Sequence, residues 1–446
     1  MTSRYTAAAH MNRREFIAWC CAFVGGPALA RNGTRLTVGS AKRRVTPPLG
    51  VPYLTSSSKG THAPFQGVHD DLFARALALD DGRNAIAVLA VDSIGYDNAI
   101  LGPGRDFTAE LRRKIAAATA LQPDAVMLAA THSHSTPETI GLTPFREVPG
   151  VPEWLEKHLD ELAATVIEAW RHRVPARVRA GVTKVEGIAR YRRIRLRNGK
   201  ESRRGPLPPP DEVAVPWRLD EDLNILHFER ADGAPLATLL NYTAHPVVAM
   251  LLPQVSADYP GAATAFLERE LPGNVCLFTN GCCGNVNTVH VATNFDDVRA
   301  IGETLGRAAL RKLCELRPLT ETTLACRSVT LLLEGREHCP QCPQGPFRAE
   351  VQAMRVGSVR WVSLPGEPFV ETGFALKEAG ATFVVGYANG WLGYFPIRRA
   401  YEEGGYEVAA GPWSRVASGT AERLQTAAVE CLRLMGSVPA VISSSP

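Results

Sequence analysis

The sequence of 446 residues lacks the features that mark several large classes of protein. The excess of basic over acidic side chains gives a net charge of only +4, so composition gives no reason to expect a nucleic-acid partner. Low-complexity arrays and an obvious linker are missing, and the ten cysteines show no dense spacing that would indicate a disulfide scaffold. Cys339 and Cys342 form a CxxC pair without a second pair to complete a structural zinc site, which favours a surface disulfide or two loop thiols.

The residues that are present indicate a large α/β domain. Hydrophobic residues make up 45% of the chain, and apolar strands, glycine turns and amphipathic helices recur from about Leu36 to the end. The expected strands are residues 85–91, 125–130, 224–229, 236–242 and 275–278. The expected helices are one opened by residues 107–115, and residues 152–173, 262–271, 296–316 and 421–435. This alternation predicts a single large layered domain with a mixed, largely buried sheet flanked by helices.

The N-terminus carries an export pattern. Arg13 and Arg14 form a twin-arginine signature before the short apolar stretch 18–26, and Ala28-Leu29-Ala30 offers a small-x-small cleavage site. The apolar stretch is too short to anchor the chain in a bilayer. We therefore predict a signal peptide over residues 1–30 and a mature domain over 31–446. The protein would be exported by the twin-arginine (Tat) machinery to the periplasm or the medium, with a net charge of about +2 and eight cysteines.

Two histidines follow one of the expected strands. His132 and His134 come directly after the apolar run 125–130, and alternate residues of an extended segment point the same way. Neutral imidazole is the commonest protein ligand for zinc, so converging histidines suggest a metal. An HxH pair by itself is weak evidence, because polar residues are ordinary at the end of a strand.

Other strand ends carry polar residues as well. His245 ends the apolar run 237–244, Glu367 closes the segment 359–367, and a loop over residues 280–287 follows the run 275–278. Asp92 ends the strand 85–91 and either orients a metal-bound histidine or caps the next turn. These residues form a constellation of possible metal ligands at strand ends.

At this point the sequence resembles the amidase domain of the neutral/alkaline non-lysosomal ceramidase family. The blocks that carry the resemblance occur in the family's order: residues 38–50, 67–76, 131–137, 256–261, 364–367 and 389–394, with Tyr401 and Tyr406 behind them. The resemblance implies one catalytic zinc. Its ligands by motif match are His132, His245, Glu367 and Tyr394, and a phenolate is possible there because the metal's charge lowers the pKa of a bound tyrosine.

The resemblance implies further roles around the zinc. His134 would lie behind the ligands or contact the substrate, and Tyr406 would hydrogen-bond the developing oxyanion. Arg192 matches the family's active-site arginine, with Arg190 as the fallback because Tyr191 replaces the asparagine expected before Arg192.

The chain departs from the family at one important position. Asn287 occupies the place of a serine that has been proposed as a nucleophile in the ceramidases, and an amide cannot attack. The attacking group should then be water or hydroxide on the zinc, with His134 or Glu138 as proton shuttle. Asn287 and the backbone N–H groups of residues 281–284 could hold the oxyanion. A catalytic thiol at Cys282 or Cys283 is a less favoured alternative.

The substrate is less clearly indicated. Trp391 replaces an expected tyrosine, the polar run after Tyr394 differs, and we expect the family's C-terminal immunoglobulin-like domain to be absent. We therefore expect cleavage of an N-acyl amide, ceramide or a related lipid amide, with transient contact to a membrane surface. The arginines of 190–197, with Arg203 and Arg204, could attract an anionic headgroup or form a solvated loop face. The alternatives are a zinc hydrolase of another amide or ester and a non-catalytic exported binding protein.

Overall fold

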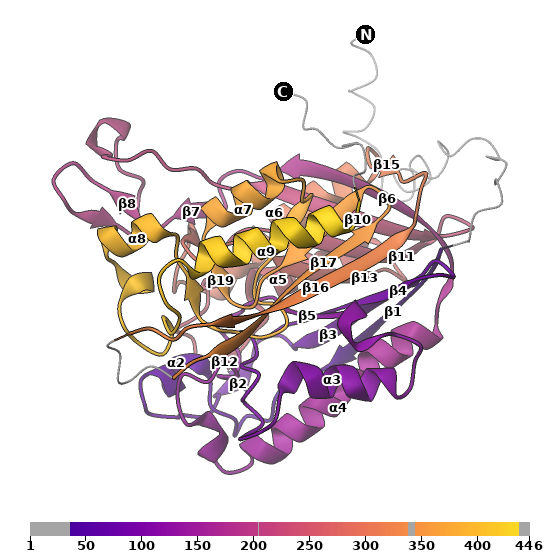
Figure 1. Cartoon of the computed structure of the whole chain (residues 1–446), viewed down its shortest axis with the longest axis horizontal. Helices are drawn as coiled ribbons and strands as arrows, with labels where there is room; N and C mark the ends of the chain where they lie inside the picture. Colours follow the sequence, from indigo (N-terminus) through magenta and orange to yellow (C-terminus); the bar gives the residue numbers. More distant parts are fainter. Residues whose placement is uncertain (1–35, 204, 338–343, 437–446) are drawn as a thin grey trace, which may run out of the picture.

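The computed structural model describes residues 36–203, 205–337 and 344–436 (Figure 1). The predicted signal peptide, the CxxC pair of Cys339 and Cys342, and Arg204 lie outside the described residues, so the division into 1–30 and 31–446 stays a prediction. Within the described part of the chain, no helix has the length and the apolar character that crossing a membrane requires.

The largest sheet has nine strands within the described residues, and its path runs β13-β11-β10-β6-β1-β3-β4-β5, with β15 paired to β6. The strands are β1 (Thr37–Arg44), β3 (Phe73–Asp80), β4 (Ala85–Val91), β5 (Val126–Ala130), β6 (Val174–Lys184), β10 (Asp222–Arg230), β11 (Pro235–Tyr242), β13 (Val275–Asn280) and β15 (Arg317–Pro318). The pairs β4·β5 and β11·β13 are parallel and the others antiparallel, so the sheet is mixed, as predicted.

Side chains alternate between the two faces of this sheet along each strand, and both faces are buried. On β3, Ala74, Ala76 and Ala78 face the helices, whereas Leu77 and Leu79 face the opposite side. The small alanines let helices pack closely on the first face. These helices are α3 (Phe107–Ala116), α4 (Val151–Arg171), α5 (Asp258–Glu270) and α6 (Phe295–Leu313).

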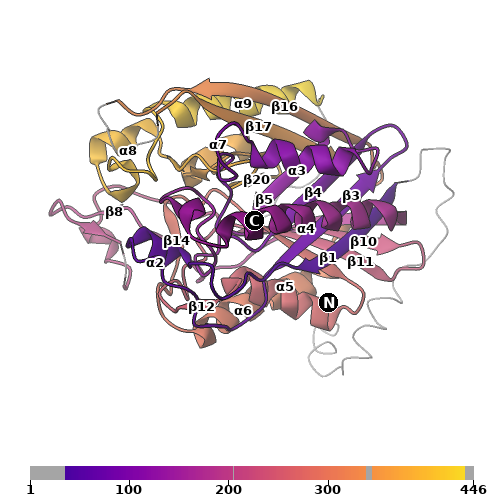
Figure 2. The same cartoon turned by 90° about the horizontal axis from the view of Figure 1, so that it is seen from below.

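A second sheet packs on the other face. It has the order β16-β17-β18-β20, with β16 (Leu324–Leu333), β17 (Phe347–Val356), β18 (Val359–Ser363) and β20 (Phe383–Val385). Its side chains Met354, Trp361 and Phe383 share one buried cluster with Leu77 and Leu79 of the large sheet. Helices α7 (Val370–Glu378) and α9 (Thr420–Leu434) cover its far side, so the layers run helix, sheet, sheet, helix. Figure 2 shows α9 with β16 and β17 along one edge and α5 and α6 along the opposite edge.

The remaining elements are short. They are α2 (Leu54–Ser58), α8 (Arg398–Glu403), and the strand pairs β2 (Gly67–Val68) with β12 (Gln254–Val255), β7 (Ala189–Tyr191) with β14 (Val286–Thr288), β8 (Ile194–Arg195) with β9 (Glu201–Ser202), and β19 (Glu367–Pro368) with β21 (Tyr394–Phe395). Four 3-10 turns complete the described chain: η1 (Pro123–Ala125), η2 (Phe145–Glu147), η3 (Pro210–Glu212) and η4 (Tyr406–Val408).

The layered α/β domain expected from the sequence is confirmed, with the ends of several elements shifted and with strands that were not expected. Helix α5 begins at Asp258, four residues before the predicted start, because Pro260 falls in the first helical turn, where no N–H is needed. The second sheet was not predicted, because β16, β17 and β20 were not among the expected strands.

Hydrogen bonds bring the ends of distant strands together. Strands β5 and β13 end the sheet path at opposite sides, yet the side chain of Asn280, at the end of β13, donates to the carbonyls of Thr131 and Ala244. The segment after β20 is hydrogen-bonded to both of these strands. The Gly386 N–H donates to the Asn280 carbonyl in β13, and the Ala130 N–H in β5 donates to the Tyr387 carbonyl. The residues that follow β5, β11 and β13 therefore meet in one place.

Candidate metal centre

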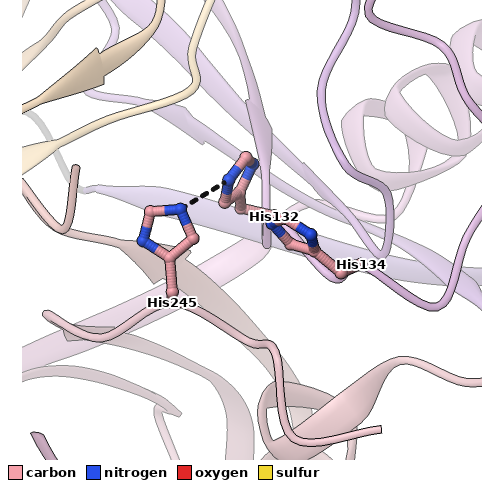
Figure 3. Close-up of side chains that lie close together, drawn as sticks. All are labelled: His132, His134 and His245. Carbon is pink, nitrogen blue, oxygen red and sulfur yellow. Dashed lines mark hydrogen bonds between the residues drawn. The ribbon is translucent and has the colours of Figure 1, made fainter. Parts of the chain in front are cut away.

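Three histidines converge where these strands end (Figure 3). His132 and His134 follow β5, His245 follows β11, and one ring nitrogen of each lies within 4.8 Å of the others. His132 and His245 are fully buried. The structure thus assembles the three histidines into a group that could hold a metal ion.

The hydrogen bonds of His132 and His245 define their tautomers. Each Nδ1 lies 2.6 Å from a backbone carbonyl, that of Ile94 for His132 and that of Cys283 for His245. A carbonyl only accepts, so we assign the hydrogen to Nδ1, and in neutral imidazole Nε2 then carries a bare lone pair. Burial lowers the pKa of His245 to about 4, which keeps it neutral at pH 7. The two Nε2 atoms lie only 3.2 Å apart, and a shared cation would stabilise this arrangement.

Nε2 of His134 and Oε2 of Glu367 are two further potential ligand atoms at this place. Nε2 of His134 is buried and has no hydrogen-bond partner among the described residues, and burial holds the pKa of this imidazole well below its usual value. Glu367 Oε2 lies 3.1 Å from Nε2 of His245 and 3.5 Å from Nε2 of His132. Burial alone would raise the pKa of Glu367, and positive charge at the histidines holds this pKa well below its usual range; a bound cation would supply such charge while each histidine stays neutral. Imidazoles with one carboxylate form a donor set that fits zinc.

Backbone strain accompanies the cluster. His132 has φ +68° and Tyr387, whose ring stacks on the His132 imidazole at 3.8 Å, has φ +57°. Left-handed backbone is uncommon for residues other than glycine, and it gathers at functional sites where the surrounding structure stabilises it.

Tyr394 lies next to Glu367 but is not part of the histidine cluster. Strands β19 and β21 pair in parallel, with Glu367 opposite Tyr394. The Tyr394 hydroxyl accepts a hydrogen bond of 3.0 Å from Arg192. Burial raises the pKa of this phenol well above its usual value, and Arg192 counteracts part of that effect. The assignment of Tyr394 as a metal ligand stays a prediction.

All three side-chain nitrogens of Arg192 donate hydrogen bonds to groups around the site. It donates to Glu407 Oε1 at 2.8 Å, to Asn287 Oδ1 at 2.9 Å, and to the Gly284 carbonyl and the Tyr394 hydroxyl. Asn287, at the family's serine position, therefore has its amide oxygen engaged and its N–H groups left as donors.

The fallback arginine has other partners. Arg190 donates to the Gly205 carbonyl and to the Ser202 hydroxyl. Of the two arginines considered from the sequence, the structure therefore places Arg192 beside Tyr394 and Asn287.

Tyr406 lies at the outer side of this group. Its ring centroid is 5.8 Å from that of Tyr394, it stacks on Trp413, and 43% of its surface is exposed. Burial of the hydroxyl raises its pKa to about 12, so the phenol keeps its proton at neutral pH and can donate it in a hydrogen bond.

Three of the four N–H groups in the predicted loop 281–284 already have partners in the fold. The N–H groups of Gly281, Cys283 and Gly284 donate to the carbonyls of Tyr242, Gly281 and Pro368. These three groups are therefore engaged within the fold and cannot hold an oxyanion.

A cysteine nucleophile is not supported either. Cys282 and Cys283 are buried, and burial raises the pKa of both thiols well above the usual value. The Cys283 thiol lies 2.9 Å from the Tyr387 hydroxyl, which gives it a structural partner. The thiolate that such a mechanism needs is therefore strongly disfavoured.

Two acidic residues considered as auxiliaries have partners outside the histidine cluster. Asp92 accepts from the Phe73 N–H and from Arg75, so it does not orient a histidine, and backbone carbonyls fill that role. The Glu138 carboxylate accepts from the backbone of Leu142 and from the Thr143 hydroxyl, and burial raises its pKa to about 7. Glu138 closes its own loop, whereas His134 belongs to the histidine group.

Sequence reasoning did not assign three residues to the site: Tyr387, Glu407 and Trp391. The indole N–H of Trp391 donates to Glu367 Oε1 at 3.2 Å. Trp391 stood out only as a departure from the family pattern. The usable signal was a tryptophan between glycines, because a buried indole N–H needs an acceptor.

Comparison with known proteins gives the fold a counterpart. No family model and no curated protein sequence matches the chain. Among solved structures, neutral ceramidase from Pseudomonas aeruginosa is similar with a TM-score of 0.72 at 18% identity, covering 93% of this chain and 77% of that chain. A structure described as ceramidase complexed with C2 is similar with a TM-score of 0.70 at 16% identity and the same coverage. The resemblance that the sequence motifs indicated therefore holds at the level of the fold, and the chain has the fold of neutral ceramidase over nearly its whole length.

Proposed function

We propose that this chain is a zinc-dependent hydrolase that cleaves an N-acyl amide, ceramide or a related lipid amide. The observation that carries the proposal is the convergence of three histidines and an ionised glutamate at the strand ends of a ceramidase fold. His132, His245 and Glu367 would hold the zinc, with Tyr394 as a fourth ligand. The bound zinc would lower the pKa of a water molecule and polarise the scissile carbonyl.

Water is the nucleophile in this proposal because the side chains considered for that role from the sequence do not fit it. Asn287 is an amide, and the thiols of Cys282 and Cys283 are buried and protonated. His134 is neutral at pH 7 and its Nε2 is unpartnered, so it can accept the proton of the attacking water. A low pKa favours handing that proton on to the departing amine.

Hydrogen-bond donors near the ligands would stabilise the negative charge that develops on the carbonyl oxygen. Tyr406 keeps its proton and can donate, and the N–H groups of Asn287 are oriented by the bond from Arg192. Donors that are already in place cost little reorganisation during the reaction, which is why such groups accelerate acyl transfer.

The test is a substrate panel with zinc-loaded protein. We expect release of fatty acid from N-acyl sphingoid bases or other N-acyl amines, loss of turnover after chelation, and its return with zinc. Hydrolysis of esters or N-acyl sugars alone would favour a hydrolase of another bond. If no member of the panel were cleaved while some still raised the Tm, a binding protein would be the better description.

We also propose export through the twin-arginine pathway, based on Arg13, Arg14 and the cleavage pattern at Ala30. In a bacterial host with this pathway, the mature protein should accumulate in the periplasm or medium with residue 31 at its N-terminus. Replacing both arginines by lysine should retain the uncleaved chain in the cytoplasm. N-terminal sequencing and fractionation check this, and equal export of the lysine variant would refute it.

A further inference from the structure

Trp391 is the residue that contacts Glu367 from the side away from the histidines. Its side chain is only 1% exposed, and an indole offers a single donor and no acceptor. That donor lies 3.2 Å from Glu367 Oε1. The bond satisfies the buried N–H and at the same time engages one of the two carboxylate oxygens.

The other oxygen is thereby directed at the histidines. Glu367 Oε2 lies 3.1 Å from Nε2 of His245 and 3.5 Å from Nε2 of His132. A carboxylate that rotated freely could present either oxygen or both. The indole bond removes this freedom and leaves Oε2 as the oxygen that faces the cluster.

The indole is itself held in place. It lies in a loop with left-handed backbone at Asn389 and Gly390, and the Asn389 amide oxygen accepts from the N–H of Leu128 in β5. The guanidinium of Arg415 lies over the indole at 4.9 Å and is fixed by Asp97. A rigid support of this kind transmits a defined orientation to the carboxylate.

Glu367 differs in this respect from the two buried histidines. Backbone carbonyls orient His132 and His245, and no substitution of a side chain removes a carbonyl. The orientation of Glu367 depends on a side chain, which can be replaced.

We propose that Trp391 is a positioning residue of the metal centre, which orients Glu367 so that one defined oxygen binds the metal. This inference rests on the proposed zinc site. Partners of metal ligands of this kind change metal affinity by about 10–100-fold when they are removed.

The experiment measures the zinc dissociation constant of the full chain by competition with a chromophoric chelator. Trp391→Phe keeps an aromatic ring but loses the donor, whereas Trp391→Tyr restores a donor. Trp361→Phe is the matched control, because Trp361 is equally buried but stacks on Phe383 between the sheets. We expect zinc binding to weaken at least about tenfold in Trp391→Phe, to recover partly in Trp391→Tyr, and to stay within about twofold of wild type in Trp361→Phe.

The outcomes separate this inference from the proposed function. Wild-type protein that binds no zinc would overturn the metal site itself. Tight zinc binding by both wild type and Trp391→Phe would overturn only the role of Trp391, as would equal weakening in the Phe and Tyr variants. If Trp391→Phe does not fold, cobalt(II) loading of wild type labelled with ¹⁵N-tryptophan should shift the indole N–H resonance that Trp391→Tyr lacks, and an unmoved resonance would overturn the proposal.

Discussion

Replacing His245 by alanine is expected to remove the bound zinc and, with it, the hydrolase activity. His245 contacts both other buried groups of the cluster, with its Nε2 lying 3.2 Å from that of His132 and 3.1 Å from Glu367 Oε2. Its loss leaves an incomplete donor set and a buried carboxylate with fewer partners. Since removing only the support of a ligand weakens metal binding by about 10–100-fold, removing the ligand should cost more than about a hundredfold.

Metal analysis of purified protein checks this expectation. Wild type should carry roughly one zinc per chain, and both His245→Ala and Glu367→Ala should carry almost none after reloading. His227→Ala is the control, because His227 is also buried, with a pKa lowered to about 4, but bonds to Thr238 inside the large sheet. Full zinc content in His245→Ala, or its loss in a folded His227→Ala, would contradict the assignment of the site.

Replacing Arg192 by methionine is expected to destabilise the fold as well as impair activity. The guanidinium serves four acceptors at once, and the carboxylate of Glu407 is only 1% exposed. Breaking a buried ion pair by removing one partner costs about 3–5 kcal/mol, because it leaves an uncompensated charge. Arg193 also bonds Glu407, at 2.7 Å, so the lower end of that range is expected.

Denaturant unfolding measures the free energy of unfolding of each variant. Two further variants show which interaction causes the loss of stability. Arg192→Met should cost less stability in a Glu407→Gln background than in wild type, because the carboxylate charge that Arg192 neutralises is then absent. Arg190→Met should cost less than Arg192→Met, since Arg190 bonds carbonyls and a hydroxyl rather than a buried carboxylate. An equal cost of Arg192→Met in the two backgrounds would show that Arg192 acts mainly through packing.

Much of the local structure was predictable from the sequence. The expected strand 85–91 coincides with β4, and the expected helix 152–173 differs from α4 by one or two residues at each end. Short-range patterns succeed here because the apolar residues of a strand or helix repeat with its own period. The convergence of His132 and His134 is confirmed, but the reason given for it is not, because the backbone at His132 is left-handed and not extended.

The parts of the site that could not be predicted depend on contacts between distant segments. Nothing in the local pattern around Trp391 shows that its N–H meets Glu367, because that bond depends on the paths of two separate loops. The role of Asp92 was undecided from the sequence, and the structure gives this carboxylate to Arg75 instead of a histidine.

The sequence by itself determined many of the strands and helices, and it placed histidines and a glutamate at the ends of predicted strands. Only the tertiary structure decided that these ends meet. Strands β5 and β13 lie at opposite ends of the sheet path, and they approach each other through Asn280 and the segment that holds Tyr387. The physical reason is that side-chain periodicity is set by neighbours along the chain, whereas convergence needs hydrogen bonds between residues more than a hundred positions apart.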